Sequence, residues 1–286
     1  MEWTWKDQTD RKEEREVVVR EAVGVPYLSF RALEELGMVK NGFSTRFGGA
    51  SKGKFATMNF SYSRGDDPKD VLENYTRMAR ALGVERDHMV VSWQTHTTNI
   101  RQVTREDLGK GVIRERDYRD IDGLITDVPG VTLVTFYADC VPLYFVDPVH
   151  RAIGLSHSGW RGTVAGMGEK TVRAMEEAFG TCASDLIVCI GPSICKDCFE
   201  VGLEVAEEFA RTFPKHTSEV IFPGVSEEKR QVDLWAANRI VLERAGVRKE
   251  NIHITDLCTK CNHENLFSHR VMGEERGNAG AFLGLE

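Results

Sequence analysis

The sequence lacks several features that would assign it to a class at once. Its 286 residues contain no run of Lys and Arg, and the net charge is −7, so a basic face for nucleic acid is not predicted. No stretch approaches the roughly eighteen uninterrupted apolar residues of a membrane helix. The highly charged residues 1–16 lack the apolar core of a signal peptide. These absences predict a cytoplasmic protein with no nucleic-acid, membrane or evident protein partner.

The chain also lacks a Pro/Ser-rich linker and an internal repeat. Apolar residues make up 41% and charged residues 28%, an ordinary balance for a globular protein. We therefore expect a charged N-terminal extension at residues 1–16 and a single domain at residues 17–286. The Gly-, Ser- and Asp-rich segment 48–68 is predicted to be a long loop, which is either functional or mobile.

Helices and strands are predicted from hydrophobic periodicity. The predicted helices cover residues 68–83, 163–179, 203–213 and 232–245. The predicted strands cover residues 42–47, 89–93, 131–137, 143–146, 152–156, 186–190 and 252–255. They follow one another without a regular βαβ rhythm, which favours an α/β or α+β domain with a mixed sheet and helices outside it.

A predicted hairpin brings two possible metal ligands together. Asp147-Pro148-Val149-His150 is a turn signal between two apolar runs. A hairpin symmetric about this turn would place Cys140 directly opposite His157 on one face, with backbones about 5 Å apart. Pro142 does not fit this pairing well, because proline cannot donate to a ladder and can break a strand or mark a bulge.

A catalytic zinc ion takes three protein ligands, and thiolate and imidazole both suit it. His96 is the candidate third ligand, because it follows the strand predicted at 89–93 in a polar loop where functional residues collect. The remaining histidines lie in charged or turn-like surroundings or near the C-terminal cysteines. Plain core packing of the cysteine and surface exposure of the histidines remain open as alternatives.

Several other residues are candidates for binding or support. Arg46 lies beside two glycines and could hold phosphate together with backbone amides, or be an exposed strand-end arginine. Arg161 follows His157 closely and is a candidate catalytic and substrate-binding residue, with a structural stacking role as the alternative. Asp139 could orient a ligand if the strand ends there.

The seven cysteines include two C-x-x-C pairs. An odd count without a secretion signal favours free or metal-binding thiols over a disulfide framework. Paired C-x-x-C motifs often hold a structural zinc. Cys195/Cys198 and Cys258/Cys261 lie farther apart than in a zinc ribbon, so a second metal is left open.

The chain resembles the laccase-domain family, the YlmD/YfiH-like proteins regarded as zinc-dependent purine nucleoside phosphorylases. The resemblance covers about residues 42–284. Its motifs are NGFSTRFGGAS at 41–51, SWQTHTTNI at 92–100, DGLITD at 122–127, ADCVP at 138–142, GLSHSGWRGT at 154–163, IGPSI at 190–194 and CTKCNHENLFSHR at 258–270.

The resemblance implies a four-layer α/β/β/α sandwich with mixed sheets, similar to the catalytic domain of cytotoxic necrotising factors. It implies that His96, Cys140 and His157 hold zinc, and that Cys140 is therefore catalytic. It also implies phosphorolysis of adenosine, inosine, guanosine and methylthioadenosine, with purine nucleoside and phosphate as substrates and adenosine deamination as a further activity.

Three other functions remain open. A Cys–His hydrolase would use Cys140 as nucleophile and His157 as base. A copper polyphenol oxidoreductase is suggested by the family's older name, although the chain has no His-x-His pair, and copper can bind a single N/S site because it outcompetes zinc. A non-enzymatic zinc module would require a fourth ligand.

Overall fold

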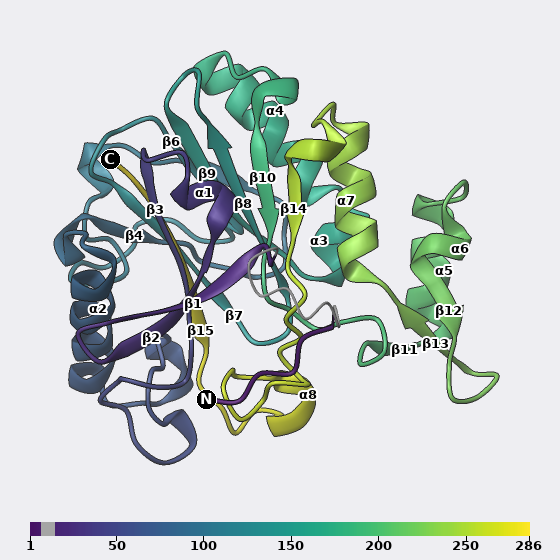
Figure 1. The fold of residues 1–286 in the computed structure, drawn as a ribbon, viewed down its shortest axis with the longest axis horizontal. Helices are drawn as coiled ribbons and strands as arrows, with labels where there is room; N and C mark the ends of the chain where they lie inside the picture. The colour runs from purple at the N-terminus through teal and green to yellow at the C-terminus, as the bar shows by residue number, and fades with distance from the viewer. Residues whose placement is uncertain (7–14) are drawn as a thin grey trace.

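Two six-stranded mixed sheets lie face to face at the centre of the molecule (Figure 1). The structure, a computed structural model, describes residues 1–6 and 15–286, so part of the predicted N-terminal extension, residues 7–14, lies outside the described residues. In order across the first sheet, the strands are β1 (Val17–Ala22), β2 (Val25–Phe30), β3 (Val39–Ser44), β15 (Ala279–Leu285), β7 (Thr132–Tyr137) and β4 (Met89–Val91). Across the second, they are β14 (Ile252–Ile254), β10 (Ile187–Ile190), β8 (Val141–Asp147), β9 (Ala152–Ser158), β6 (Gly123–Thr126) and β5 (Ile100–Gln102).

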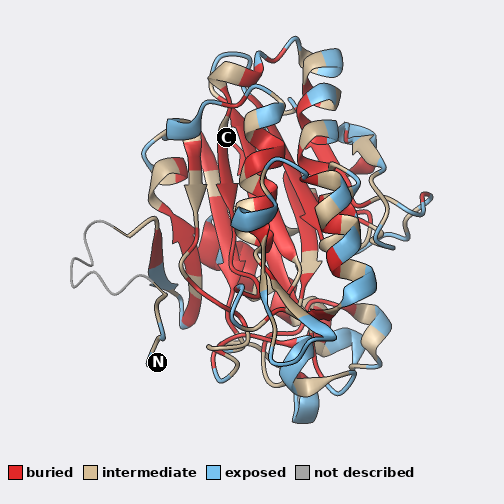
Figure 2. Ribbon diagram, turned by 90° about the vertical axis from the view of Figure 1, so that its right-hand side faces the viewer, coloured by how far each residue is buried: buried red, intermediate tan, exposed pale blue. Residues whose placement is uncertain are grey.

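Strand alternation divides the interior into layers. In β8, Tyr144 and Val146 point into the core between the sheets, whereas Leu143 and Phe145 point into a second core beneath helices. A third core lies on the outer face of the first sheet, where Phe282 packs under a helix. Figure 2 shows the strands buried almost throughout and the outer helix faces exposed. The predicted α/β class with mixed sheets is confirmed, and the layers run helix, sheet, sheet, helix.

The helices cover the two outer faces. Helix α2 (Pro68–Leu82) covers the first sheet; its first residue is proline, Asp67 caps it by accepting from the Lys69 amide, and Gly83 ends it in a left-handed conformation. On the second sheet lie α3 (Trp160–Val164), α4 (Met167–Phe179) and α7 (Leu234–Arg244). The short helices are α1 (Arg31–Glu34), α6 (Thr217–Val220) and α8 (His269–Met272). Within the described ranges, no helix combines the length and apolar character that a membrane span requires.

Three of the four predicted helices are confirmed as single elements, but the helix predicted at 163–179 is wrong at its start. The chain is already helical at Trp160, and Gly166, with a φ of 75°, separates α3 from α4. The helix predicted at 203–213 is α5 (Leu203–Thr212), which packs with α6 beside a small sheet at the right of Figure 1. That sheet consists of β11 (Glu200–Gly202), β13 (Lys229–Val232) and β12 (Ile221–Pro223).

The seven predicted strands all occur, although that predicted at 42–47 begins earlier, at Val39. Strands β1, β2, β5, β6, β15 and the small sheet were not predicted. The register predicted for the central hairpin is wrong by two residues: Pro142, not Cys140, pairs with His157. Pro142 stays within β8 rather than breaking it. Because side-chain direction repeats every two residues, the slip keeps Cys140 and His157 on one face.

Candidate active site and metal centre

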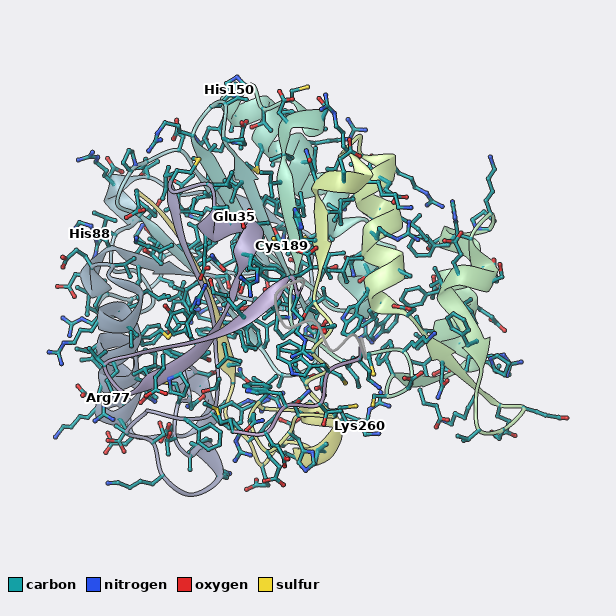
Figure 3. All side chains as sticks on the ribbon, viewed as in Figure 1. Glu35, Arg77, His88, His150, Cys189 and Lys260 are labelled. Carbon is teal, nitrogen blue, oxygen red and sulfur yellow. The ribbon has the colours of Figure 1, made fainter. Side chains whose placement is uncertain are left out.

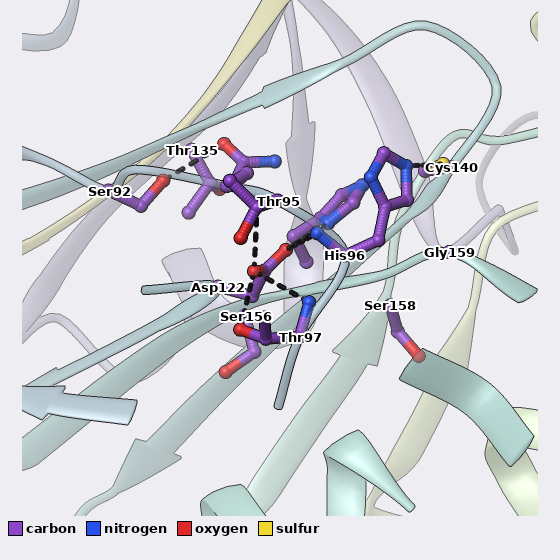
Figure 4. A network of polar contacts seen from close by, with 12 residues as sticks. Ser92, Thr95, His96, Thr97, Asp122, Thr135, Cys140, Ser156, Ser158 and Gly159 are labelled. Atoms are coloured by element: carbon purple, nitrogen blue, oxygen red, sulfur yellow. Dashed lines mark hydrogen bonds and ion pairs between the residues drawn. The ribbon is translucent and has the colours of Figure 1, made fainter. Parts of the chain in front are cut away.

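Three side chains from separate segments converge where strands of the two sheets begin or end. His96 lies in the loop after β4 with a φ of 65°, Cys140 immediately precedes β8, and His157 lies in β9. One ligand atom from each lies within 4.8 Å of the others, and Cys140 Sγ is 4.0 Å from His96 Nε2. The close-up in Figure 4 shows the His96 ring directed toward the Cys140 sulfur. The structure therefore brings the three predicted ligands together.

Asp122, just before β6, organises this site, although the sequence did not single it out. Its Oδ1 lies 2.8 Å from Nδ1 of His157, which leaves Nε2 as the ring nitrogen available to a metal. The carboxylate also accepts from the amides of Thr95, His96 and Thr97, at 3.0, 3.1 and 2.9 Å (Figure 4). One buried carboxylate thus fixes both a ligand ring and the loop that carries the second histidine.

The charges of this cluster favour an anionic sulfur. Burial raises the pKa of Cys140, but the neighbouring His157 and His96 outweigh it and lower that pKa to about 6. For His157, burial lowers the pKa, whereas the Cys140 sulfur and the Asp122 carboxylate raise it to about 9. A cation placed between the rings and the sulfur would take over the stabilising role of the imidazolium.

The donor set fits a zinc ion. In a tetrahedral site, a thiolate and an imidazole ligand lie about 3.5 Å apart, close to the separation found here between Cys140 and His96. Gly159 borders the cluster, and a Cβ there would lie 3.0 Å from Cys140 Sγ and 3.2 Å from His96 Cδ2. The absence of a side chain at Gly159 therefore keeps space open beside the three donors.

The three donors open on a cavity of about 350 Å³. Its wall includes the aromatic side chains of Tyr62, Trp93 and Phe136. Tyr62 comes from the segment 48–68, so this predicted loop contributes to the site. The cavity combines a metal-ligating corner with apolar rings, as in many small-molecule sites.

Three arginines also line the cavity, namely Arg64, Arg116 and Arg276, and none of its described lining residues is acidic. Arg276 is 8% exposed; burial and the neighbouring Arg64 lower its pKa to about 10, so it remains cationic at neutral pH. Arg116 stacks 4.4 Å from the centre of the Trp93 ring. Arg64 is ion-paired with Glu274, so in this acidic chain Arg116 and Arg276 carry most of the local positive potential, which suits an anion. The sequence offered no signal for this, because the three lie far apart along the chain.

Arg46 and Arg161 do not line this cavity. Arg46 donates to the carbonyl of His263 at 2.9 Å and stacks 5.1 Å from the Phe267 ring. Arg161 is exposed and stacks on Trp160, at 4.3 Å from the ring centre. Their roles in phosphate binding stay predictions.

Asp139 does not contact the ligand rings, contrary to one of its predicted roles. Its carboxylate accepts from the hydroxyls of Thr259 and Ser268, at 2.6 and 3.1 Å, and from the amide of Arg270. The positive φ of 85° at Asp139 turns its side chain toward the C-terminal segment. Asp139 therefore connects the C-terminal segment to the backbone immediately before Cys140. The carboxylate that orients the His157 ring is Asp122 instead.

Histidines outside the site have other surroundings. His150 lies 2.9 Å from an Asp147 oxygen and His253 lies 2.8 Å from a Glu16 oxygen. Figure 3 shows His88 and His150 at the periphery of the view. The two C-x-x-C pairs, by contrast, form a second cluster in which all four sulfurs lie within 4.8 Å of one another.

Comparison with known proteins defines the class. A family model described as multi-copper polyphenol oxidoreductase laccase matches residues 40–286, and the chain belongs to this family. It is similar to a purine nucleoside phosphorylase, YlmD of Geobacillus stearothermophilus, with 37% identity over 85% of this chain and 87% of that protein. It is also 33% identical to an adenosine deaminase, RL5, from an unknown prokaryotic organism, over 88% of this chain and 98% of that one.

Solved structures agree with this assignment. The crystal structure of the hypothetical protein YfiH of Bacillus licheniformis superposes with a TM-score of 0.87 at 30% identity, covering 94% of this chain and 99% of that one. That of YlmD from Geobacillus stearothermophilus gives 0.86 at 33% identity, with the same coverage. The predicted membership of the YlmD/YfiH-like group is confirmed. The likeness to cytotoxic necrotising factors stays a prediction.

Proposed function

We propose that this protein is a zinc-dependent purine nucleoside phosphorylase for adenosine, inosine, guanosine and methylthioadenosine, with adenosine deamination as a side activity. The observation that carries the proposal is that His96, Cys140 and His157 open on a cavity that three arginines also line. The names of the relatives YlmD and RL5 support a reaction on purine nucleosides.

His96, Cys140 and His157 would hold the zinc, with Asp122 orienting His157. When bound, zinc supplies a Lewis acid beside the cavity and lowers the pKa of water, which suits both activities. Copper would compete for the same three donors. The side chains of the chain then have to bind and orient the two substrates.

The cavity arginines would bind phosphate and the aromatic rings would bind the nucleoside. A guanidinium donates several hydrogen bonds in one plane, which matches the oxygens of phosphate. Tyr62, Trp93 and Phe136 offer flat apolar surfaces against which a purine can stack. A phosphate oxygen would form a bond to C1′ while the C1′–N9 bond breaks. The electron pair leaves with the base, which takes up a proton, and the sugar becomes ribose 1-phosphate.

The test is chromatography of the products from adenosine and inosine with and without phosphate. We expect free base and ribose 1-phosphate only when phosphate is present, and some inosine from adenosine in either case. Chelation should stop both reactions if they share one metal. Release of free ribose without phosphate would identify a hydrolase instead.

One observation favours a second candidate, the Cys–His hydrolase. His157 lies between Cys140 and Asp122, an order of side chains that also occurs in thiol hydrolases. A coordinated thiolate cannot attack a substrate, so the metal content separates the two functions. An active protein without metal, inactivated by alkylation of Cys140, would favour the hydrolase.

The copper oxidoreductase rests on the family description alone. Multicopper oxidation requires several coppers near one another, whereas the described residues bring together one His/Cys cluster and one cluster of four cysteines. Phenol oxidation that scales with bound copper, without nucleoside turnover, would support this alternative.

A further inference from the structure

Four cysteines from two loops meet away from the active-site cavity. Cys195 and Cys198 follow β10, and Cys258 and Cys261 follow β14. Strands β10 and β14 are parallel neighbours, so the loops that follow them begin at the same end of the strand pair. The two C-x-x-C pairs are far apart in the sequence, which argued against a single metal site. The parallel pairing of β10 and β14 brings them together in space.

The spacing of the sulfurs matches a four-thiolate metal site. All four lie within 4.8 Å of one another, and the Cys198 and Cys261 sulfurs are 3.5 Å apart. With zinc–sulfur bonds of about 2.3 Å, the sulfurs of a tetrahedral site lie about 3.8 Å apart. A disulfide would require about 2.05 Å for each bonded pair.

The backbone around the sulfurs is arranged as in metal-binding knuckles. The amides of Cys195 and Cys261 donate to the Cys258 sulfur, at 3.3 and 3.5 Å. The chain also turns at each C-x-x-C segment: the Cys198 amide donates to the Cys195 carbonyl at 3.0 Å, and the Asn262 amide donates to the Cys258 carbonyl at 3.0 Å. Amide donors directed at sulfur stabilise a thiolate rather than a thiol.

The cluster is largely buried. Cys195 is 2% exposed and Cys258 is fully buried, whereas Cys198 and Cys261 are half-buried. Residues 1–6 cross the same region, where the Lys6 amide donates to the Asp256 carbonyl and Lys6 forms an ion pair with Asp197. Lys260, labelled in the lower part of Figure 3, lies between the two cysteines of the second loop. Four protein ligands and burial characterise structural zinc.

We propose that Cys195, Cys198, Cys258 and Cys261 bind one zinc ion that is distinct from the His96/Cys140/His157 centre and has a structural role. Both loops contact Asp139: the Ile194 amide donates to its carbonyl at 3.0 Å, and the Thr259 hydroxyl donates to its carboxylate at 2.6 Å. Zinc in the four-cysteine centre holds these loops together and thereby fixes the backbone that leads into Cys140.

Elemental analysis of untagged protein purified without added metal tests the proposal. We expect about two zinc per chain in the wild type, and about one in each of Cys140→Ala and Cys198→Ser. Cys182→Ser is the matched control, because Cys182 is an exposed free thiol outside both clusters, and it should retain both metals.

Cobalt substitution keeps the test independent of whether Cys198→Ser folds. Cys140→Ala, stripped and reloaded with Co²⁺, should show the intense visible bands and sulfur-to-metal charge-transfer absorption of a four-thiolate centre. Mercurial titration of native Cys140→Ala, which lacks the thiol of the other centre, should release its remaining zinc as the four thiols are blocked. Two outcomes would overturn the proposal: no metal in a folded Cys140→Ala, or intact-mass evidence of disulfides among the four cysteines. Neither outcome bears on nucleoside phosphorolysis.

Discussion

Asp122 and His157 are joined twice, once through their side chains and once through their backbones. The Asp122 carboxylate lies 2.8 Å from Nδ1 of His157, and the His157 amide donates to the Asp122 carbonyl at 2.7 Å. The backbone bond aligns the start of β6 with β9, and the side-chain bond sets the ring within that alignment. The ligand ring is therefore oriented by the sheet itself.

Asp122→Asn should weaken zinc binding by about 10- to 100-fold, because the amide loses the charge that orients and polarises His157. The measurement is competition with a chromophoric chelator. Asp127→Asn is the control, since Asp127 is exposed at the end of the same strand and should leave the affinity unchanged. Equal affinities in the two variants would show that the Asp122 charge does not support the metal.

Gly159→Ala should also weaken zinc binding, by about tenfold or more. The metal-free variant should unfold at nearly the same denaturant concentration as the metal-free wild type. The Gly159 φ of −65° is open to alanine, so the effect would come from the added methyl group near Cys140 and His96. In the control Gly162→Ala, the nearest atom to the new Cβ is a backbone oxygen at 3.4 Å. Unchanged zinc affinity in Gly159→Ala would refute the crowding explanation.

Replacing Arg64, Arg116 or Arg276 by Gln should raise the phosphate KM by about tenfold or more, with a smaller effect on the nucleoside KM. Each change removes a charge from the cavity wall while keeping a polar side chain. Steady-state kinetics with each substrate varied in turn provides the measurement.

Arg46→Ala and Arg161→Ala test the phosphate roles predicted from the sequence in the same assay. A selective rise in the phosphate KM in either of them, with none in the three cavity variants, would transfer the phosphate site to these arginines. Equal changes for both substrates would indicate a structural role instead.

Asp107 provides a pH-dependent test of stability. Burial raises its pKa, but Lys110, the Thr104 amide and Arg101 outweigh burial and lower it to about 2. Because the folded-state pKa lies below the usual 3.8, the carboxylate stabilises the fold above about pH 4, and this contribution is lost as the pH falls toward 2. The side chain is 2% exposed, and the shift corresponds to about 2 kcal/mol.

Asp107→Asn should therefore reduce the free energy of unfolding by about 2 kcal/mol at neutral pH, with the difference from wild type shrinking below about pH 4. Urea unfolding at several pH values measures this. Asp117→Asn removes the exposed carboxylate bound to the same Lys110 ammonium and should have a smaller effect. A difference between wild type and Asp107→Asn that stays constant down to pH 2 would contradict the proposed cause.

Local patterns determined much of the secondary structure and one face of the hairpin. Periodicity was enough to place α2, and the structure shows the Asp67 cap and Gly83 at its two ends; all of these signals involve near neighbours in the chain. The register of the hairpin slipped by two because the turn, Pro148–Arg151, is centred one residue later than the predicted turn, Asp147–His150. Because side chains alternate between the two faces of a strand, a shift of two residues leaves Cys140 and His157 on the same face. The predicted proximity of Cys140 and His157 is therefore correct although the register is not.

The sequence by itself determined that His96, Cys140 and His157 are candidate ligands, through their residue types and the family motifs. Only the tertiary structure decided their supports: Asp122 rather than Asp139, the arginines of the cavity wall, and the meeting of the two C-x-x-C loops. Cys198 and Cys261 are 63 residues apart and become neighbours because β10 pairs with β14. Strand order and backbone angles such as the positive φ of Asp139 are set by the packing of the whole chain, so no local pattern reveals them.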